Sequence, residues 1–310
     1  MERESIDISI CACTYKRPDG LRKLLTSLLA LNVPAGVRAE VLIVDNDANA
    51  SAREIVASVA PLASIPISYV VEAQSGVGYA RNRCMREAAG EWVAFIDDDE
   101  WAEAAWLSAL LATAQSQGAD IVMGPVVPAF AEAATPGMLA SAFFARPRYA
   151  TGMRLDWRQC ATGNVLLKRK LFQDVGGFSA AFAIGGGEDS EFFSRCGQRG
   201  AVMVWCDTAL VHEEIPAERM TRRWLVKRSF VNGNNYARVC RARDGRLAYA
   251  DAVLRGLVSI AAYVPATLFA RVVRHPKALA FECKVAAGFG KIASLFSTPP
   301  NIFGGQDEGS

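Results

Sequence analysis

The 310-residue sequence contains no CxxC pair, only two histidines and no apolar run near its N-terminus. Its eight cysteines are scattered, four of them in apolar strand-like runs: Cys11, Cys13, Cys84, Cys160, Cys196, Cys206, Cys240 and Cys283. This spacing favours neither a zinc site nor a disulfide framework, so we expect reduced thiols in a cytosolic compartment. The charged opening MERESID lacks the apolar core of a secretory signal, and we expect none.

No GxGxxG follows the first strand-like run, and the stretch CTYKRPDG at 13–20 is poor in glycine. The first absence disfavours a hydride-transferring dehydrogenase. The second disfavours a sugar nucleotidyltransferase, which would hold phosphate on a glycine-rich loop. With 51% apolar and 21% charged residues, the chain can bury a full core in one large domain with an appendage.

The net charge of +2 hides an uneven distribution of charge along the chain. Between Pro216 and Phe296, fifteen lysines and arginines stand against four acids, a local excess of about +11. The preceding 215 residues are therefore acidic. A basic, apolar C-terminal quarter predicts a membrane surface or an anionic ligand as its neighbour.

Strand-like runs alternate with amphipathic helical patterns through the first part of the chain. The strand-like runs are IDISICACT (6–14), AEVLIVDN (39–46), ISYVVEA (67–73), WVAFIDDD (92–99) and ADIVMGPVV (119–127). This alternation predicts an α/β fold with a mostly parallel sheet covered by helices on both faces. The segment 128–160 loses the period and predicts a long loop, after which regular structure returns at GNVLLKRKLF (163–172).

Three of these runs end in polar side chains. Thr14 ends the first, Asp45 the second, and the triplet Asp97, Asp98 and Asp99 the fourth. Ligands of parallel sheets bind beyond the carboxyl ends of the strands, so these are candidate binding residues. In an extended chain Asp97 and Asp99 point to one side, about 7 Å apart at Cα. Their repulsion favours a bound cation, and Mg²⁺ or Mn²⁺ prefers such oxygen ligands together with substrate phosphates.

A plainer alternative exists for the acidic triplet. It could form a solvated acidic turn in which Asp99 caps a helix that begins near Ala102. The triplet alone does not decide between a metal site and a helix cap.

Other motifs along the chain favour the metal site. In order, they are CTYKRP (13–18), IVDN (43–46), GVGYARN (76–82), FIDDD (95–99), GNVLLKR (163–169), VGGF (175–178), GGGEDSEF (185–192) and a late His212. From about Ile8 to about Glu214 the sequence resembles the family 2 inverting glycosyltransferases, which have the glycosyltransferase-A fold. Its C-terminal quarter more loosely resembles that of members building bacterial exopolysaccharides. The resemblance implies a Rossmann-like nucleotide-binding domain followed by amphipathic helices.

The resemblance also implies which residues bind the donor. Thr14 and Arg17 would border the nucleotide pocket, and Asp45 would accept a hydrogen bond from the base. Arg81 would approach the donor's diphosphate or the carboxylates of the DxD motif. For Arg81 an ordinary ion pair on a helix surface is the alternative.

Within the DxD motif, Asp97 would contact the ribose or a metal-bound water, and Asp99 would bind the metal directly. Asp98 is the variable middle position, which we group with the donor-binding residues. His212 follows an apolar strand and would complete the metal shell, since imidazole can bind Mn²⁺. A structural histidine at a strand end is the alternative.

Sugar transfer also needs a base for the attacking hydroxyl, and the resemblance assigns this role to Asp189, with Glu188 helping to orient the acceptor. Such a carboxylate must be held in line and partly desolvated. The glycines at 185–187 would let the backbone approach a sugar. Favourable acidic charge at a helix N-terminus is the alternative for both acids.

The C-terminal quarter contains two informative stretches. RMTRRWLVKRSFVNGNNYARVCRAR (219–243) predicts a basic, aromatic helix without a nucleic-acid motif, so lipid-linked phosphate or anionic headgroups are the expected neighbours, with a solvated face as the alternative. In 253–273 the uncharged core from Gly256 to Ala270 would span about 22 Å, short of the roughly 30 Å hydrocarbon core. Pro265 would kink it. We expect helices lying in the membrane interface, with a true span as the alternative.

These observations predict a glycosyltransferase, using Mn²⁺ or Mg²⁺, that moves a sugar from a nucleotide-diphosphate sugar to a lipid-linked saccharide. It would bind no nucleic acid and would lie on the cytoplasmic face of a bacterial inner membrane, peripheral or monotopic. The expected domains are a catalytic 1–215, a membrane-associating 216–296 and a flexible tail 297–310. A sugar nucleotidyltransferase and a non-catalytic scaffold of a polysaccharide assembly are the alternatives.

Overall fold

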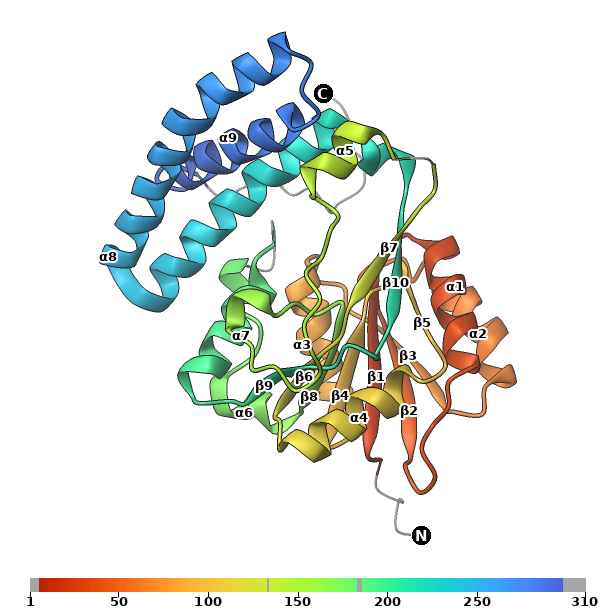
Figure 1. Cartoon of the computed structure of the whole chain (residues 1–310). Helices are drawn as coiled ribbons and strands as arrows, with labels where there is room; N and C mark the ends of the chain where they lie inside the picture. The colour runs from red at the N-terminus through yellow and green to blue at the C-terminus, as the bar shows by residue number, and fades with distance from the viewer. Residues whose placement is uncertain (1–5, 133, 183–185, 298–310) are drawn as a thin grey trace. The chain divides into compact units, whose positions relative to one another are not determined.

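A seven-stranded sheet forms the centre of the first part of the chain (Figure 1). The computed structural model describes residues 6–132, 134–182 and 186–297. In the order β3-β2-β1-β4-β8-β6-β9, the strands are β3 (Ile67–Val71), β2 (Ala39–Asp45), β1 (Ile8–Thr14), β4 (Trp92–Ile96), β8 (Asn164–Lys168), β6 (Ile121–Met123) and β9 (Met203–Trp205).

A second, three-stranded sheet has the order β5-β10-β7. Its strands are β5 (Glu100–Ala102), β10 (Val211–Ile215) and β7 (Val126–Phe130). The α-helices are α1 (Pro18–Leu29), α2 (Arg53–Val59), α3 (Val77–Glu87), α4 (Trp106–Gln117), α5 (Pro136–Ser141), α6 (Lys170–Val175), α7 (Glu188–Gln198), α8 (Arg222–Val272) and α9 (Ala278–Ala293). Short 3₁₀ turns lie at Ala60–Leu62, Trp157–Gln159, Ala180–Phe182 and Ala217–Met220.

The predicted mostly parallel sheet is confirmed. The pairs β1–β2, β2–β3, β1–β4 and β6–β9 are parallel, and β8 runs antiparallel to both of its neighbours, β4 and β6. The chain adds β2 and β3 on one side of β1 and then returns to add β4 on the other. The carboxyl ends of β1 and β4 therefore lie side by side where the strand order reverses, the usual position of a ligand site in such sheets.

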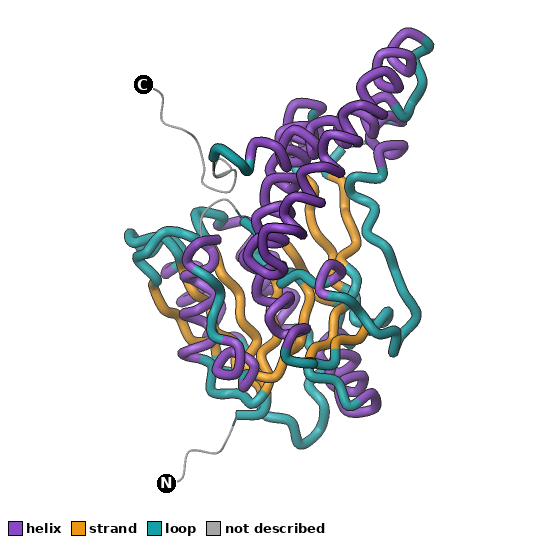
Figure 2. The backbone as a smooth tube through the Cα atoms, turned by 90° about the vertical axis from the view of Figure 1, so that its left-hand side faces the viewer, coloured by secondary structure: helices purple, strands orange, loops and turns teal. Residues whose placement is uncertain are grey.

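Alternate side chains of β1 serve the two faces of the sheet. Ile8, Ile10 and Ala12 belong to the large apolar cluster that includes the inner faces of α1, α2 and α4. On the other face the Cys13 sulfur lies 3.6 Å from that of Cys84 in α3. In the turned view of Figure 2, helices flank the strands of this region. The expected covering of both faces is therefore present.

A buried asparagine joins the sheet to the elements around it. Asn164, at the start of β8, is 1% exposed. Its side-chain oxygen accepts a hydrogen bond from the indole of Trp106 at 2.8 Å. Its amide donates to the carbonyls of Pro125 at 2.9 Å and Ala209 at 2.8 Å. One side chain thus satisfies a helix and two loops inside the core.

Two compact units divide the chain. The first comprises residues 1–127, 147–184 and 188–213, and the second comprises 128–146, 185–187 and 214–310. The segment 128–160, predicted as a loop, contains the end of β7, α5 and a 3₁₀ turn, and it contributes to both units. Of the predicted tail, residues 298–310 lie outside the described residues.

The second unit is built mainly from α8 and α9 (Figure 1). Gly245 (φ 79°, ψ −160°) breaks α8 into a first segment, 222–244, and a second segment, 246–272. Pro265 lies within the second segment, and the break in α8 is at Gly245, which the sequence reasoning did not predict; the kink at Pro265 stays a prediction. By length and composition, α8 passes as a candidate membrane span.

The stretch after the acidic triplet also differs from expectation. The helix expected near Ala102 begins at Trp106, and Glu100–Ala102 form β5, which pairs with β10. The helix is preceded by Ala105, which makes no side-chain cap. The alternative in which Asp99 caps this helix is therefore excluded.

We expect Asn164→Leu to lower the free energy of unfolding by about 2–3 kcal/mol, because it leaves the Trp106 N–H and the Ala209 carbonyl without this partner. The Pro125 carbonyl loses one of its two hydrogen bonds and keeps the one from the Val211 N–H at 3.2 Å. Trp106→Phe removes one of these bonds and part of a fully buried ring, and should cost about 2–3 kcal/mol. Urea titration followed by circular dichroism measures both. Equal stability of Asn164→Leu and wild type would show that these bonds contribute nothing.

Candidate active site

Asp98 ties together the two loops at the carboxyl ends of β1 and β4. The Thr14 hydroxyl donates to its Oδ2 at 2.8 Å, and Arg17 Nη1 donates to its Oδ1 at 2.9 Å. A Cβ placed on Gly20 would lie 2.5 Å from the Asp98 carbonyl oxygen, so the first turn of α1 needs glycine where it meets this loop. Asp98 is 4% exposed. Thr14 and Arg17 are therefore gathered at the predicted edge, but both hold Asp98.

Burial raises the pKa of Asp98 to about 6, although the adjacent Arg17 guanidinium opposes this effect. The buried carboxylate thus depends on Arg17 and Thr14 for its charge near neutral pH. In this structure Asp98 acts as an anchor for the loop. Its grouping with the donor-binding residues stays a prediction.

The acidic triplet forms a turn rather than the extended chain that was predicted, because the Glu100 N–H donates to the Asp97 carbonyl at 3.1 Å. Asp97 and Asp99 are its more exposed members. Their side chains are 44% and 20% exposed. Arg17 Nη1 also lies 3.1 Å from Asp99 Oδ2. Two accessible carboxylates thus stand on either side of a buried one.

Glu100 is a site residue that the sequence reasoning missed. Its side chain is buried and accepts a hydrogen bond from the backbone N–H of Asp97 at 2.9 Å. A Cβ on Gly163 would lie 2.7 Å from Glu100 Oε1, so the GN motif leaves space for this carboxyl. Burial, and then the charges of Asp97 and Asp99, raise the pKa of Glu100 well above its usual value. The fourth acid in the run DDDE was the available signal.

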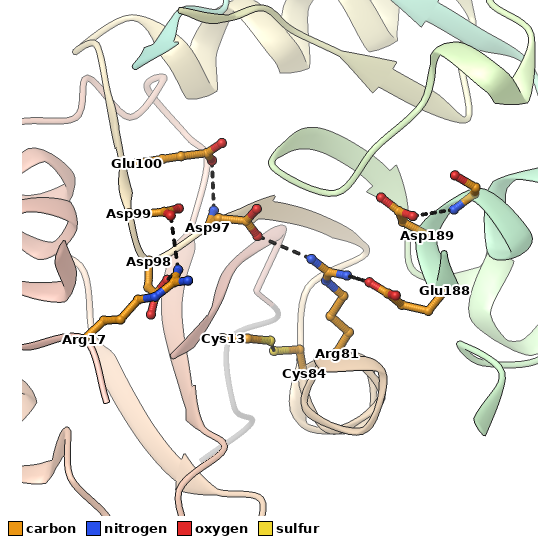
Figure 3. A network of polar contacts seen from close by, with 11 residues as sticks. Cys13, Arg17, Arg81, Cys84, Asp97, Asp98, Asp99, Glu100, Glu188 and Asp189 are labelled. Carbon is orange, nitrogen blue, oxygen red and sulfur yellow. Dashed lines mark hydrogen bonds and ion pairs between the residues drawn. The ribbon is translucent and has the colours of Figure 1, made fainter. Parts of the chain in front are cut away.

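Arg81 joins the DxD motif to the acidic pair at the start of α7 (Figure 3). Its Nη2 lies 3.4 Å from Asp97 Oδ1, and its Nη1 forms an ion pair with Glu188. Both Arg81 and Glu188 are buried. Burial alone would lower the pKa of Arg81, but Glu188 and Asp97 raise it above its usual value. The surface ion pair considered for Arg81 is therefore excluded.

Glu188 carries an unusual buried oxygen. Its Oε2 has no hydrogen-bond partner among the residues that the structure describes. Burial raises the pKa of Glu188, and the Arg81 guanidinium opposes this shift. An unsatisfied buried carboxylate oxygen is costly unless a further donor reaches it. Glu188 is thus arranged to hold Arg81, and its predicted contact with the acceptor stays a prediction.

Asp189 lies beside Glu188 in the first turn of α7, facing the same region as Asp97 (Figure 3). Its Oδ1 accepts a hydrogen bond from the Ser190 backbone N–H at 2.6 Å, which fixes the carboxylate. Gly186 and Gly187 before it have φ of 89° and 94°, values that favour glycine. Gly185 lies outside the described residues.

Asp45 is fully buried at the end of β2. One oxygen accepts from the Asp47 N–H at 3.0 Å, and the other accepts from the Ala52 N–H at 2.8 Å and the Tyr69 hydroxyl at 2.7 Å. Both oxygens are therefore engaged in holding the loop after β2. The predicted contact between Asp45 and the base stays a prediction.

His212 lies in β10 opposite Trp101 of β5, the strand that follows Asp99. Its ring stacks on Trp101 with centroids 5.3 Å apart, and its Nε2 lies 3.1 Å from Glu103 Oε1. Within 6–132, 134–182 and 186–297, no group of three or more His, Cys, Asp or Glu side chains is placed to hold a metal ion. Ligation by His212 stays a prediction.

Asp97 and Asp99 nevertheless suit a hard cation. The atoms that they offer to a metal are all carboxylate oxygens, and both side chains are accessible. Mg²⁺ and Mn²⁺ often take one or two protein carboxylates and complete their shells with substrate phosphates and water. The two residues therefore fit a metal that binds together with a phosphate-bearing substrate.

Comparison with known proteins decides the family. The family model "Glycosyl transferase family 2" matches residues 9–176, and "N-terminal domain of galactosyltransferase" matches residues 144–212. The chain is 37% identical over 241 residues to "Succinoglycan biosynthesis protein ExoM" of Rhizobium meliloti, covering 77% of each chain. It belongs to glycosyltransferase family 2. The protein is therefore a glycosyltransferase, the class of enzyme that its motifs predicted.

Solved structures agree on the fold. A mannosyltransferase from Pyrobaculum calidifontis, solved with GDP-Man and Mn²⁺, aligns with a TM-score of 0.62 and 18% identity over 94% of this chain and 88% of that one. S. aureus TarS 1–349 with UDP aligns with a TM-score of 0.55 and 16% identity, covering 93% and 91%. The chain spans 43% of a longer TarS chain. The predicted glycosyltransferase-A type fold is confirmed.

The raised pKa of Asp98 predicts a pH dependence of stability. Because the folded chain binds this proton more tightly than the unfolded chain, the contribution is full below the ordinary pKa of 3.8 and is lost as the pH rises through about 6. As the pH rises from 3.8 to above 6, the melting temperature of wild type should therefore fall relative to that of Asp98→Asn. A difference that stays constant from pH 3.8 to above 6 would contradict the assignment.

Proposed function

We propose that this protein is a metal-dependent, inverting glycosyltransferase that moves a sugar from a nucleotide-diphosphate sugar to a lipid-linked saccharide in bacterial exopolysaccharide assembly. The observation that carries this proposal is the Arg81 side chain, which joins Asp97 to Glu188. It brings the DxD carboxylates and the Glu188–Asp189 pair into one site. Sugar transfer from donor to acceptor needs the metal-binding carboxylates and the base to lie close together.

The donor side of the proposed site lies at the ends of β1 and β4. Asp97 and Asp99 would hold Mn²⁺ or Mg²⁺, with His212 as a proposed third ligand. When bound, the metal would neutralise charge on the leaving diphosphate. Thr14, Arg17 and Asp98 would shape the loop around the nucleotide, and Asp45 stays the proposed acceptor for the base. The structurally similar mannosyltransferase solved in complex with GDP-Man and Mn²⁺ supports this class of donor.

Asp189 is the proposed base. In a single displacement the acceptor oxygen forms a bond to the anomeric carbon while the bond to the nucleoside diphosphate breaks, and Asp189 takes the hydroxyl proton. The hydrogen bond from the Ser190 N–H fixes one carboxylate oxygen and leaves the other available. Arg81 would place positive charge beside the region where the diphosphate leaves. Glu188 holds Arg81 there.

The proposed acceptor and the proposed cellular location are supported by two further observations. The name of the Rhizobium meliloti relative concerns succinoglycan biosynthesis, and we propose a related polysaccharide role for this chain. A lipid-linked acceptor would be met at the cytoplasmic face of the inner membrane, and the long apolar helix α8 is consistent with association there. The protein would attach as a peripheral or monotopic enzyme.

We expect Asp189→Asn to lower the transfer rate by about 10²–10⁴-fold while donor affinity stays near that of wild type, because the change removes a base and leaves the donor pocket intact. Radiolabelled sugar transfer measures the first, and calorimetry with a nucleotide sugar and Mn²⁺ measures the second. Asp156→Asn, at an exposed carboxylate of the first unit, is the matched control and should retain full rate. Normal turnover of Asp189→Asn would refute the assignment.

Asp99→Asn should weaken donor binding in the presence of Mn²⁺ by about tenfold or more, equivalent to about 1.4 kcal/mol. The effect should largely disappear when the metal is removed with EDTA, because a missing metal ligand then no longer matters. Thermal shift titrations of UDP-, GDP- and dTDP-sugars with and without Mn²⁺ measure it. Identical metal-dependent stabilisation of both proteins would remove Asp99 from the proposal.

A further inference from the structure

Large apolar side chains gather on the outside of the second unit. Among the described residues, fourteen large hydrophobic side chains are exposed, and twelve of them lie between residues 247 and 296. The twelve are Leu247, Leu254, Leu257, Val258, Val264, Leu268, Phe269, Val272, Val273, Phe289, Leu295 and Phe296. Isolated exposed apolar residues are common, but a concentration of this kind marks a binding surface.

Small residues occupy the inside of the same unit. A Cβ on Gly256 would lie 2.9 Å from the Gly288 carbonyl oxygen, and a Cβ on Gly288 would lie 2.8 Å from that of Gly256. The first segment of α8 also meets α9 through glycines. A Cβ on Gly233 would lie 2.1 Å from the Ala287 carbonyl oxygen, and a Cβ on Gly290 would lie 1.9 Å from that of Phe230. The backbone of α9 thus packs against both segments of α8 through glycines. Such packing leaves the larger apolar side chains to face outward, as in helices that meet lipid.

The outward face of the second segment of α8 is continuous. At 100° per residue its exposed members occupy an arc of about 160°. The members are Leu254, Leu257, Val258, Ala261, Ala262, Val264, Pro265, Leu268, Phe269 and Val272. Between Leu254 and Val272 no charged residue lies within this arc, whereas Arg246 and Asp251, which precede Leu254, share its angular range. Arg255 and Arg271, the charged residues between its ends, fall at its two edges.

We propose that this outer face of 254–272 inserts into one leaflet of an anionic phospholipid bilayer, with the helix lying along the membrane plane. This inference rests on the proposed membrane association and names the surface that makes it. Arg255 and Arg271, whose side chains are accessible, would extend to lipid headgroups from the edges of the inserted face. A soluble core helix would be mostly buried, whereas the most apolar 18-residue window of α8 is 17% buried.

The distribution of charge selects the orientation. The uncharged stretch from Gly256 to Ala270 spans about 22 Å, less than the roughly 30 Å of hydrocarbon. Arg246 precedes it, and Arg271, Arg274 and Lys277 follow it. An end-on insertion would bury one of these basic ends in hydrocarbon. Lying flat keeps both ends at the level of the headgroups.

The charge of this region also favours a bilayer over a second copy of the chain as the partner of the apolar face. From Arg246 to Lys291 seven basic residues stand against two acidic ones. Two copies meeting through this face would bring like charges together, whereas anionic headgroups complement them. The apolar arc is also convex, being one side of a helix, and so suits a fluid layer better than a pocket. The expected occupant is therefore lipid.

The test uses the full-length protein and sedimented vesicles of phosphatidylethanolamine with phosphatidylglycerol. Wild type should bind these vesicles, and added salt should weaken binding. The double variant Leu257→Glu with Leu268→Glu should bind at least about tenfold more weakly, because two carboxylates would enter hydrocarbon. Leu62→Glu, at an exposed leucine of the first unit, is the control and should bind as wild type does.

Two results would overturn the proposal. One is vesicle binding by the double variant equal to that of wild type. The other is wild type that ignores vesicles but forms a dimer, in analytical ultracentrifugation, that the double variant abolishes. Since the substituted leucines are exposed, both variants should melt near the wild-type temperature, and circular dichroism checks this.

Orientation is tested with an environment-sensitive dye on introduced cysteines, Leu254→Cys, Ala261→Cys and Phe269→Cys, with labelled wild type as background. Quenching by spin-labelled lipids should place all three at similar depth. A steady increase in depth from 254 to 269 would overturn the in-plane arrangement.

Mn²⁺-dependent donor hydrolysis in vesicle-free buffer, measured on the double variant, separates this inference from the proposed chemistry. Loss of vesicle binding with intact hydrolysis would show that the two substitutions affect the membrane surface alone.

Discussion

The arrangement of the site depends on the buried guanidinium of Arg81. Acidic side chains converge on it from the end of β4 and from the start of α7, and without a cation between them their mutual repulsion would separate the two segments. Arg81 is itself placed by α3, whose N-terminal turn is fixed by Asn46: the Asn46 side chain accepts from the Gly76 N–H at 2.8 Å. The geometry of the proposed reaction centre is thus a consequence of charge compensation inside the first unit.

Neighbouring acids at the end of β4 perform different tasks because the turn after this strand, closed by the hydrogen bond from the Glu100 N–H to the Asp97 carbonyl, buries some of them and leaves others exposed. Asp98 and Glu100 are buried and fix the loop, whereas the side chains of Asp97 and Asp99 are 44% and 20% exposed and can be reached by a ligand. A buried acid must be held by donors or lose its charge, and both buried residues have raised pKa values for this reason. The run DDDE therefore combines a scaffold and a binding surface within four residues.

Much of this architecture could be predicted from sequence because it follows from periodicity and from motifs. The strand and helix alternation, the converging polar edge and the helix bearing the ED pair are all local in origin. The rest depends on tertiary context. Nothing local distinguishes Asp45, saturated by Tyr69 and two backbone donors, from a ligand-binding acid. Likewise, β5 exists because β10 pairs with it from more than a hundred residues away.

The interleaving of the two units constrains how the chain can be shortened. Residues 128–146 belong with the C-terminal helices, and Phe143 and Phe144 pack on Trp224 with ring centroids 5.8 Å and 6.3 Å apart. A truncation after residue 213 would remove Trp224 and leave these two phenylalanines in water, where they would promote aggregation. A soluble catalytic fragment therefore requires replacing 128–146 with a short polar linker as well as removing the C-terminal helices.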